Sequence, residues 1–291
     1  MLECSTTNPE PARIAQAPSA RFDPRRIYTV LLAVPLVYAA IRYLPLQAFI
    51  VLTALVGGIA LMELYRMTLI PPYDKILGGL GLLGFAALVA GADRSDVLVP
   101  VLLVTLFVFM SVPLVARIPL SQLVTQVSLA LFGVLYLGLT LSYVVWTRQL
   151  PQGEWLVFLL LLITWAGDTG AYFVGTCCGR HALAPRISPK KTLEGLAGGL
   201  SGAMIAAFMA RWGFMPDLSS LDCILMSVLL TGFGLWGDLA ESAIKRSAGV
   251  KDSGGVLPGH GGMLDRLDSL LFAAPAFYYY LTVFGRAGAH P

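Results

Sequence analysis

The sequence predicts an all-α, polytopic integral membrane protein. Of its 291 residues, 57% are hydrophobic and 13% are charged, whereas about a quarter of the residues of an ordinary soluble protein are charged. The apolar residues form runs of about 20, the length that an α-helix needs to cross a bilayer. Most of the basic residues lie in every second connection between these runs, and so on one side of the membrane. Such a chain cannot fold around one aqueous core with a polar coat.

Nine segments are long and apolar enough to be predicted as membrane-spanning helices. They lie near residues 27–44, 47–65, 76–92, 97–116, 123–146, 154–176, 193–213, 221–245 and 265–285. Residues 1–26 are rich in Pro, Ser and Arg and lack the apolar core of a signal peptide, so we expect a disordered tail. Residues 27–150 should form a five-helix framework. Residues 151–291 should form a second region, of four helices and two polar loops, that carries the candidate site.

The basic residues predict the orientation of these spans. Of the 20 Lys and Arg residues, 15 fall on the side of the N-terminus and five on the other, an asymmetry that marks the cytoplasmic side. We therefore expect a cytoplasmic N-terminus, an external C-terminus and an odd number of spans in the inner membrane. The polar loops at 177–192 and 246–264 then face the cytoplasm. This distribution follows the membrane side and gives no support for nucleic-acid binding.

The stretch 242–268 interrupts the apolar pattern and reads SAIKRSAGVKDSGGVLPGHGGMLDRLD. Its six glycines can bring backbone N–H groups close to an anion. The stretch also supplies four cations and three carboxylates: Lys245, Arg246, Lys251 and Arg266, with Asp252, Asp265 and Asp268. Magnesium prefers a few carboxylates together with phosphate oxygens. This composition therefore indicates a site for a magnesium–nucleotide phosphate.

Asp238 is an acid within a predicted span. It lies eight residues before Arg246, or ~12 Å below that end of its helix, where an acid costs roughly 2.5–3.5 kcal/mol. Asp238, Ser242 and Lys245 follow i, i+4, i+7 spacing and share one helix face. We predict Asp238 and Asp265 as the Mg²⁺ ligands. In the alternative, Asp265 caps its helix and pairs with Arg266, while Asp238 pairs with Lys245.

A second polar cluster lies earlier in the chain. Asp168 sits within the span at 154–176, and the loop that follows contains Ser188-Pro189-Lys190-Lys191-Thr192. Pro189 fixes a turn, and the two lysines precede a predicted helix whose free N–H groups also favour phosphate. The alternative is a basic anchor for anionic headgroups. Asp168 could contact a metal or a ribose, or could only balance the lysines.

Residues 242–268 resemble the signature of the phosphatidate cytidylyltransferases (CDP-diacylglycerol synthases), and the Ser-Pro-Lys-Lys-Thr loop resembles their active-site loop. The resemblance runs through Ser242, Lys245-Arg246, Lys251-Asp252, Pro258, His260-Gly261-Gly262, Asp265-Arg266 and Asp268. It implies nucleotidyl transfer from CTP to phosphatidate, giving CDP-diacylglycerol and pyrophosphate in phospholipid biosynthesis. It also implies Mg²⁺, with a second cation as an option, and suggests a homodimer.

With this resemblance, we assign catalytic roles to Asp238, Asp265, Lys190, Lys191, Lys245 and Asp268. Substrate-binding roles go to Asp168, Ser188, Ser242, Arg246, Lys251, Asp252, His260, Gly261, Gly262 and Arg266. For His260 we favour a hydrogen bond to the glycine turn or a phosphate over a general base, because a phosphate monoester is already anionic. We interpret Glu63 as an interfacial residue rather than a catalytic one. The alternatives are a CTP-dependent polyprenol or phytol kinase and, outside the enzymes, a cation transporter.

Overall fold

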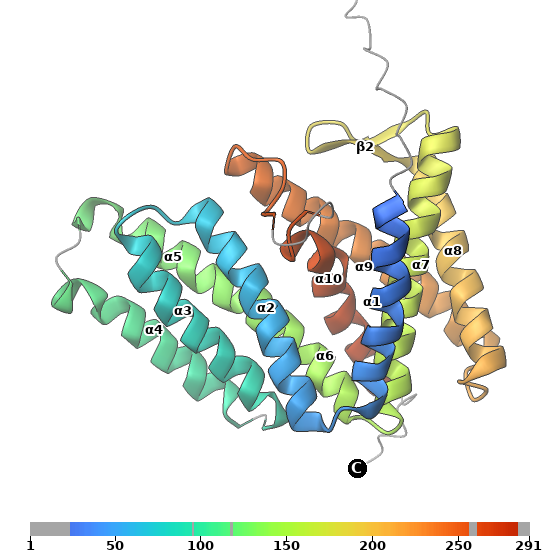
Figure 1. The fold of residues 1–291 in the computed structure, drawn as a ribbon, viewed down its shortest axis with the longest axis horizontal. Coiled ribbons are helices and arrows are strands. Elements are labelled where there is room, and N and C mark those ends of the chain that lie inside the picture. The colour runs from blue at the N-terminus through green and yellow to red at the C-terminus, as the bar shows by residue number, and fades with distance from the viewer. Residues whose placement is uncertain (1–23, 95, 117–118, 256–260, 285–291) are drawn as a thin grey trace, which may run out of the picture.

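The computed structural model describes residues 24–94, 96–116, 119–255 and 261–284, with the side chains of 24–33 and of residue 93 left out. The chain folds into long helices that run roughly side by side (Figure 1). The helices of the first half are α1 (Pro24–Tyr43), α2 (Leu46–Thr68), α3 (Tyr73–Ala90), η1 (Gly91–Asp93), α4 (Leu98–Val115), η2 (Leu120–Gln122), α5 (Leu123–Gly133), η3 (Val134–Leu139) and α6 (Thr140–Gln149). The second half contains α7 (Gly153–Cys178), β1 (Ala182–Ala184), β2 (Ser188–Thr192), α8 (Leu193–Gly213), α9 (Ser220–Ser247) and α10 (Leu264–Val283).

Helices lie at all nine predicted segments, and seven of them are long and apolar enough to cross a membrane. Residues 120–149, which include η2, α5, the π-helical turn η3 and α6, count as one of the seven. Among the described residues, α10 does not qualify, since it carries three charged residues in its first five positions. The chain is therefore a helical membrane protein. A helix suits this setting because its backbone hydrogen bonds are all internal.

The prediction of a purely helical fold needs one correction. The polar loop at 177–192 contains a two-stranded antiparallel sheet, in which Ala182 pairs with Thr192 and Ala184 with Ser188. This hairpin lies beyond the ends of α7 and α8, at one end of the helices (Figure 1). The predicted tail falls outside the described residues except at 24–26, where α1 begins.

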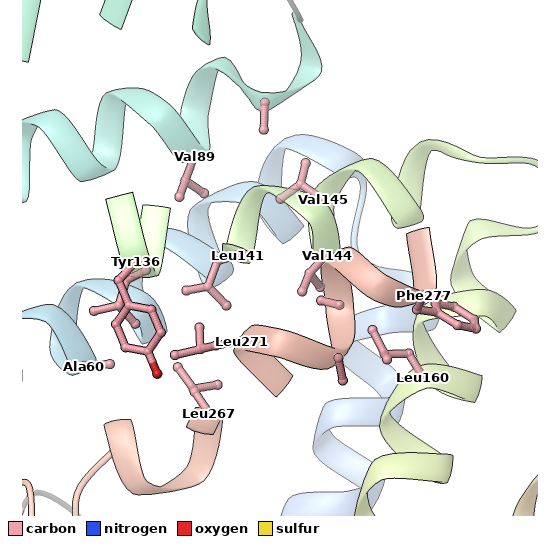
Figure 2. Close-up of a cluster of buried hydrophobic side chains, with 14 of the residues drawn as sticks. Ala60, Val89, Tyr136, Leu141, Val144, Val145, Leu160, Leu267, Leu271 and Phe277 are labelled. Carbon is pink, nitrogen blue, oxygen red and sulfur yellow. The ribbon is translucent and has the colours of Figure 1, made fainter. Parts of the chain in front are cut away.

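One hydrophobic core includes residues from both halves of the chain. Ala60 of α2, Tyr136 of η3 and Leu141 of α6 lie close to Leu267 and Leu271 of α10 in Figure 2. All five side chains are at most 9% exposed. Helix α10, which opens with the acids of the signature stretch, is thus embedded among helices of the first half.

Helices α7 and α8 meet along a line of glycines. A Cβ atom at Gly170 would meet the backbone of Gly198, and one at Gly202 would meet the backbone of Ala166. Small residues at such spacing let helix backbones approach closely in membranes. This contact fixes α8, and with it the strand β2 that leads directly into α8.

Candidate active site

A polar cavity of about 340 Å³ lies among β2 and helices α7 to α10. Its charged lining residues come from both sequence clusters: Asp168, Lys190, Lys191, Asp238, Asp265 and Asp268. Thr192, Thr231 and Ser269 add hydroxyl groups. The structure therefore brings together six of the predicted site residues in a single cavity.

The hairpin positions the two lysines. The carboxylate of Glu194 accepts hydrogen bonds from the backbone N–H groups of Arg180 (3.0 Å) and His181 (3.2 Å), and its Oε1 lies 2.6 Å from His181 Nδ1. Thr192 caps α8 by accepting a hydrogen bond from the N–H of Gly195 at 3.0 Å, the usual role of a Thr at this position. The base of the hairpin is thereby tied to the first turn of α8.

Lys191 and Asp238 form an ion pair across the cavity. Lys191 Nζ lies 2.5 Å from Asp238 Oδ2, and the hydroxyl of Ser242 donates to Asp238 Oδ1 at 3.4 Å. The i, i+4 relationship predicted for Asp238 and Ser242 is therefore present. The ion-pair partner of Asp238 is Lys191, not the Lys245 of the structural alternative.

Three carboxylates gather on the side of Asp238. Oxygens of Asp238, Glu241 and Asp268 lie within 4.8 Å of one another. Close approach of α9 and α10 permits this, because Gly237 has no Cβ and a Cβ there would meet the carbonyl oxygen of Asp268. Hard carboxylate oxygens at this separation suit Mg²⁺. The donor set fits a divalent cation, and the cluster is a candidate metal site.

Asp265 is held by a different set of groups. Its Oδ1 lies 2.7 Å from Lys245 Nζ, and its Oδ2 accepts hydrogen bonds from the N–H groups of Gly262 (2.8 Å) and Ser253 (3.3 Å). Lys245 also lies 2.6 Å from Glu241 Oε2, so its ammonium group sits between two acids. Asp265 therefore connects the polar loop to α9. It is not part of the carboxylate cluster, although it lines the same cavity.

Glu63, interpreted from the sequence as an interfacial residue, lies inside the protein and contacts the polar loop. Its side chain is buried (2% exposed), and it accepts hydrogen bonds from Ser253 Oγ (3.2 Å) and from the N–H of Leu264 (2.9 Å). A residue of the first half thus contacts the signature stretch.

A second, apolar cavity of about 700 Å³ adjoins the polar one. Its lining comes from α1, α2, α6, α7 and α10, and it includes Arg266 of α10. Thr164, Asp168 and Ser269 line both cavities. The hydroxyl of Ser269 donates to Asp168 Oδ1 at 3.4 Å. Asp168 therefore lies where the apolar and polar cavities meet.

The remaining predicted residues lie around the cavity or outside it. Gly261 and Gly262 lie just before α10 and beside Asp265. Arg246, Lys251 and Asp252 are exposed, Ser188 begins β2, and none of the four lines the polar cavity. His260 falls outside the described residues.

No site role was predicted for Glu241 or Ser269; Thr192 was recognised only as part of its loop motif, and Glu63 was interpreted as interfacial. Glu241 lies three residues after Asp238 and four before Lys245, and this spacing could have identified it. Glu63 is an acid in a long apolar segment, which is itself a signal of a functional or paired group.

The apolar helices and the charged cavity define a helical membrane protein whose polar site opposes lysines to carboxylates. Its family follows from comparison with known proteins. Residues 24–284 match the Cytidylyltransferase family, and the chain belongs to that family. The predicted resemblance is thereby confirmed.

The relatives in this family include named enzymes. The chain is 34% identical to the phosphatidate cytidylyltransferase of Staphylococcus haemolyticus over 257 residues, 86% of this chain and 95% of that one. It is 41% identical to the phosphatidate cytidylyltransferase of Bacillus subtilis over 160 residues, 55% of this chain and 60% of that one. It is 42% identical to the uncharacterized protein YnbB of Escherichia coli over 166 residues, 55% of each chain. The last two alignments thus span little more than half of those relatives.

Proposed function

We propose that this chain is a phosphatidate cytidylyltransferase that converts CTP and phosphatidate into CDP-diacylglycerol and pyrophosphate. The observation that carries the proposal is the ion pair of Lys191 with Asp238 beside the acids Glu241 and Asp268. It places positive charge for phosphates next to donors for a divalent cation. The names of the relatives support the same reaction.

In this reaction a phosphate oxygen of phosphatidate forms a bond to the α-phosphorus of CTP. The bond from that phosphorus to the bridging oxygen of the β-phosphate breaks, and pyrophosphate leaves. Lys190 and Lys191 would contact the phosphates and offset the repulsion between two anionic substrates. Thr192 and the first turn of α8 lie beside them and would contribute a hydroxyl and free N–H groups.

Asp238, Glu241 and Asp268 would hold Mg²⁺. When bound, Mg²⁺ supplies charge neutralisation at the transferred phosphate. Asp265, the second ligand predicted from the sequence, would instead keep Lys245 and the loop in place beside the cluster.

The lipid substrate would reach the site from the membrane. The apolar cavity along α1, α2 and α7 would hold an acyl chain, with the phosphate at the end near Asp168, Ser269 and Arg266. Burial of each methylene of an acyl chain contributes about 0.8 kcal/mol, so the cavity can add substantially to binding. The nucleotide would enter the polar cavity from the opposite side.

The orientation follows from the basic residues. We place the polar cavity and both charged loops on the cytoplasmic side, where CTP is available, with nine spans and an external C-terminus. A homodimer, suggested by the resemblance, is part of the same proposal.

Labelled CTP tests the reaction. Purified protein in mixed micelles with phosphatidate should transfer the label of [α-³²P]CTP to lipid and release the label of [γ-³²P]CTP as pyrophosphate. Transfer of the γ label to a lipid alcohol would show a lipid kinase instead. Transfer of neither label, in protein that binds CTP, would reject both reactions.

A further inference from the structure

A carboxylate from the first half of the chain contacts the polar loop at 246–264 on both sides of the residues that the structure leaves out. Glu63 Oε2, on α2, accepts hydrogen bonds from the Ser253 hydroxyl and from the backbone N–H of Leu264. These residues follow it by 190 and 201 positions. Glu63 is not among the residues that line the polar cavity, so any effect on that cavity is indirect.

Ser253 is shared between two acids. Its hydroxyl donates to Glu63, while its backbone N–H donates to Asp265. Gly262, close to the other end of the loop, donates its N–H to Asp265. Glu63 and Asp265 thus hold the same loop from two sides, one from α2 and one from α10.

Two glycines of the loop make room for Glu63. A Cβ atom at Gly254 would lie 2.6 Å from Glu63 Oε1, and one at Gly262 would lie 2.5 Å from Glu63 Oε2. Real Cβ atoms are not found at such distances from oxygen. The Glu63 carboxylate therefore occupies space that these glycines leave open, and at Gly262 the Ser253 hydroxyl lies nearer still.

We infer that Glu63 is a positioning residue for the reaction: it fixes Ser253 and Leu264, and through them the first turn of α10 that carries Asp265 and Asp268. A buried carboxylate is costly unless hydrogen bonds compensate it. What Glu63 gains for the protein is the correct position of the acids on α10, because a displacement of about 1 Å at a catalytic group can lower a rate ~10²-fold.

Substitution of Glu63 tests this role against a structural one. Glu63→Ala should lower kcat on the order of 10²-fold and raise the Mg²⁺ concentration needed for half-maximal rate, at unchanged KM for phosphatidate. Glu63→Gln keeps an oxygen acceptor and should recover most of the activity. The matched control is Asp222→Ala, because Asp222 is also a buried acid (1% exposed) but lies at the start of α9 in a capping box with Ser219.

The control should give less folded protein with normal kinetics per folded molecule. If Glu63→Ala behaves in the same way, Glu63 is structural and the inference is wrong. A second pair of variants tests the contact itself. Gly254→Ala should lower activity, and Glu63→Asp in the same chain, which shortens the acid by one methylene, should relieve it. Equal loss with and without Glu63→Asp would contradict the contact.

The kinetic part of this inference rests on the proposed function, whereas amide hydrogen exchange does not. Glu63→Ala should speed exchange at Ser253 and Leu264 relative to wild type. If wild type shows no turnover while exchange responds as expected, the proposed function fails, and the positioning role with it, but the contact stands. If turnover is normal and exchange at these amides is unchanged in Glu63→Ala, the inference fails and the proposed function stands.

Discussion

Lys191 on β2 and Asp238 on α9 lie 2.5 Å apart, Nζ to Oδ2, although 47 positions separate them in the chain. Lys190 and Lys191 both line the polar cavity, but Lys190 is exposed, whereas Lys191 is half-buried and paired with Asp238. Successive residues of a strand point to opposite sides, which explains this difference. The two lysines of the motif are therefore not equivalent.

We predict different losses for the two lysines. Lys191→Ala should lower kcat by about 10²-fold, the usual effect of removing one donor from a site that stabilises developing charge. Lys190→Ala serves as the matched variant and should have a smaller effect, mainly on KM for CTP. Steady-state kinetics with varied CTP measure both. Normal kinetics in both variants and in the double variant would make the loop a membrane anchor only.

The carboxylate cluster predicts non-additive losses. Asp238→Asn and Asp268→Asn should each abolish turnover, and the double variant should be scarcely worse, because residues that act as a unit are not additive. Each should also lose the rise in melting temperature that Mg²⁺ gives the wild type. Residual activity with an ordinary Mg²⁺ response in either variant would remove that residue from the metal site.

Asp265→Asn should differ from these two variants. Its side chain and that of Lys245 are 14% and 12% exposed, and removing one partner of such a pair costs about 3 kcal/mol. We expect loss of activity together with a lower melting temperature in the absence of Mg²⁺, measured by scanning fluorimetry in detergent. If Asp265→Asn is as stable as wild type without Mg²⁺ and fails to respond to the ion, Asp265 is a ligand, as the sequence predicts.

The apolar cavity predicts a change confined to the lipid. Ala40 lines it, and Ala40→Trp should raise KM for long-chain phosphatidate by about tenfold, since two buried methylenes correspond to ~1.6 kcal/mol. KM for CTP and for a short-chain phosphatidate should not change. Val104→Trp, on the exposed side of α4 (59% exposed), is the control. An unchanged KM for the long-chain lipid would exclude this cavity as the acyl site.

The distribution of basic residues predicts the sidedness. A reporter fused after residue 291 should be external, and one inserted near Gly254 should be cytoplasmic. Alkaline phosphatase and green fluorescent protein fusions report the two locations. Both reporters on one side would contradict the nine-span prediction, because α10 would then not cross the membrane.

The helices could be predicted from the sequence, because a long apolar run in a bilayer satisfies its backbone hydrogen bonds best as a helix. It was not sufficient for the hairpin, since Ser188–Thr192 is polar, contains a proline and shows none of the alternation that marks a strand. Asp238 could be recognised from its depth in a span. The apolar segment marks Glu63 as a paired group, but its partner could not be predicted, because Ser253 follows it by 190 positions. The pairing of Lys191 with Asp238 required the close approach of α8 and α9, which spacing alone does not define.

The glycine contact between α7 and α8 also limits which parts of the site can move. Where backbone meets backbone, as at Gly170 and Gly198, no layer of side chains is present that could change rotamer and let one helix slide past the other. The hairpin tied to α8 by Glu194 and Thr192 shares this rigidity, so Lys191 behaves as a fixed wall of the cavity. We therefore expect any opening that the proposed reaction needs to involve the opposite wall, where the acids lie on α9 and α10.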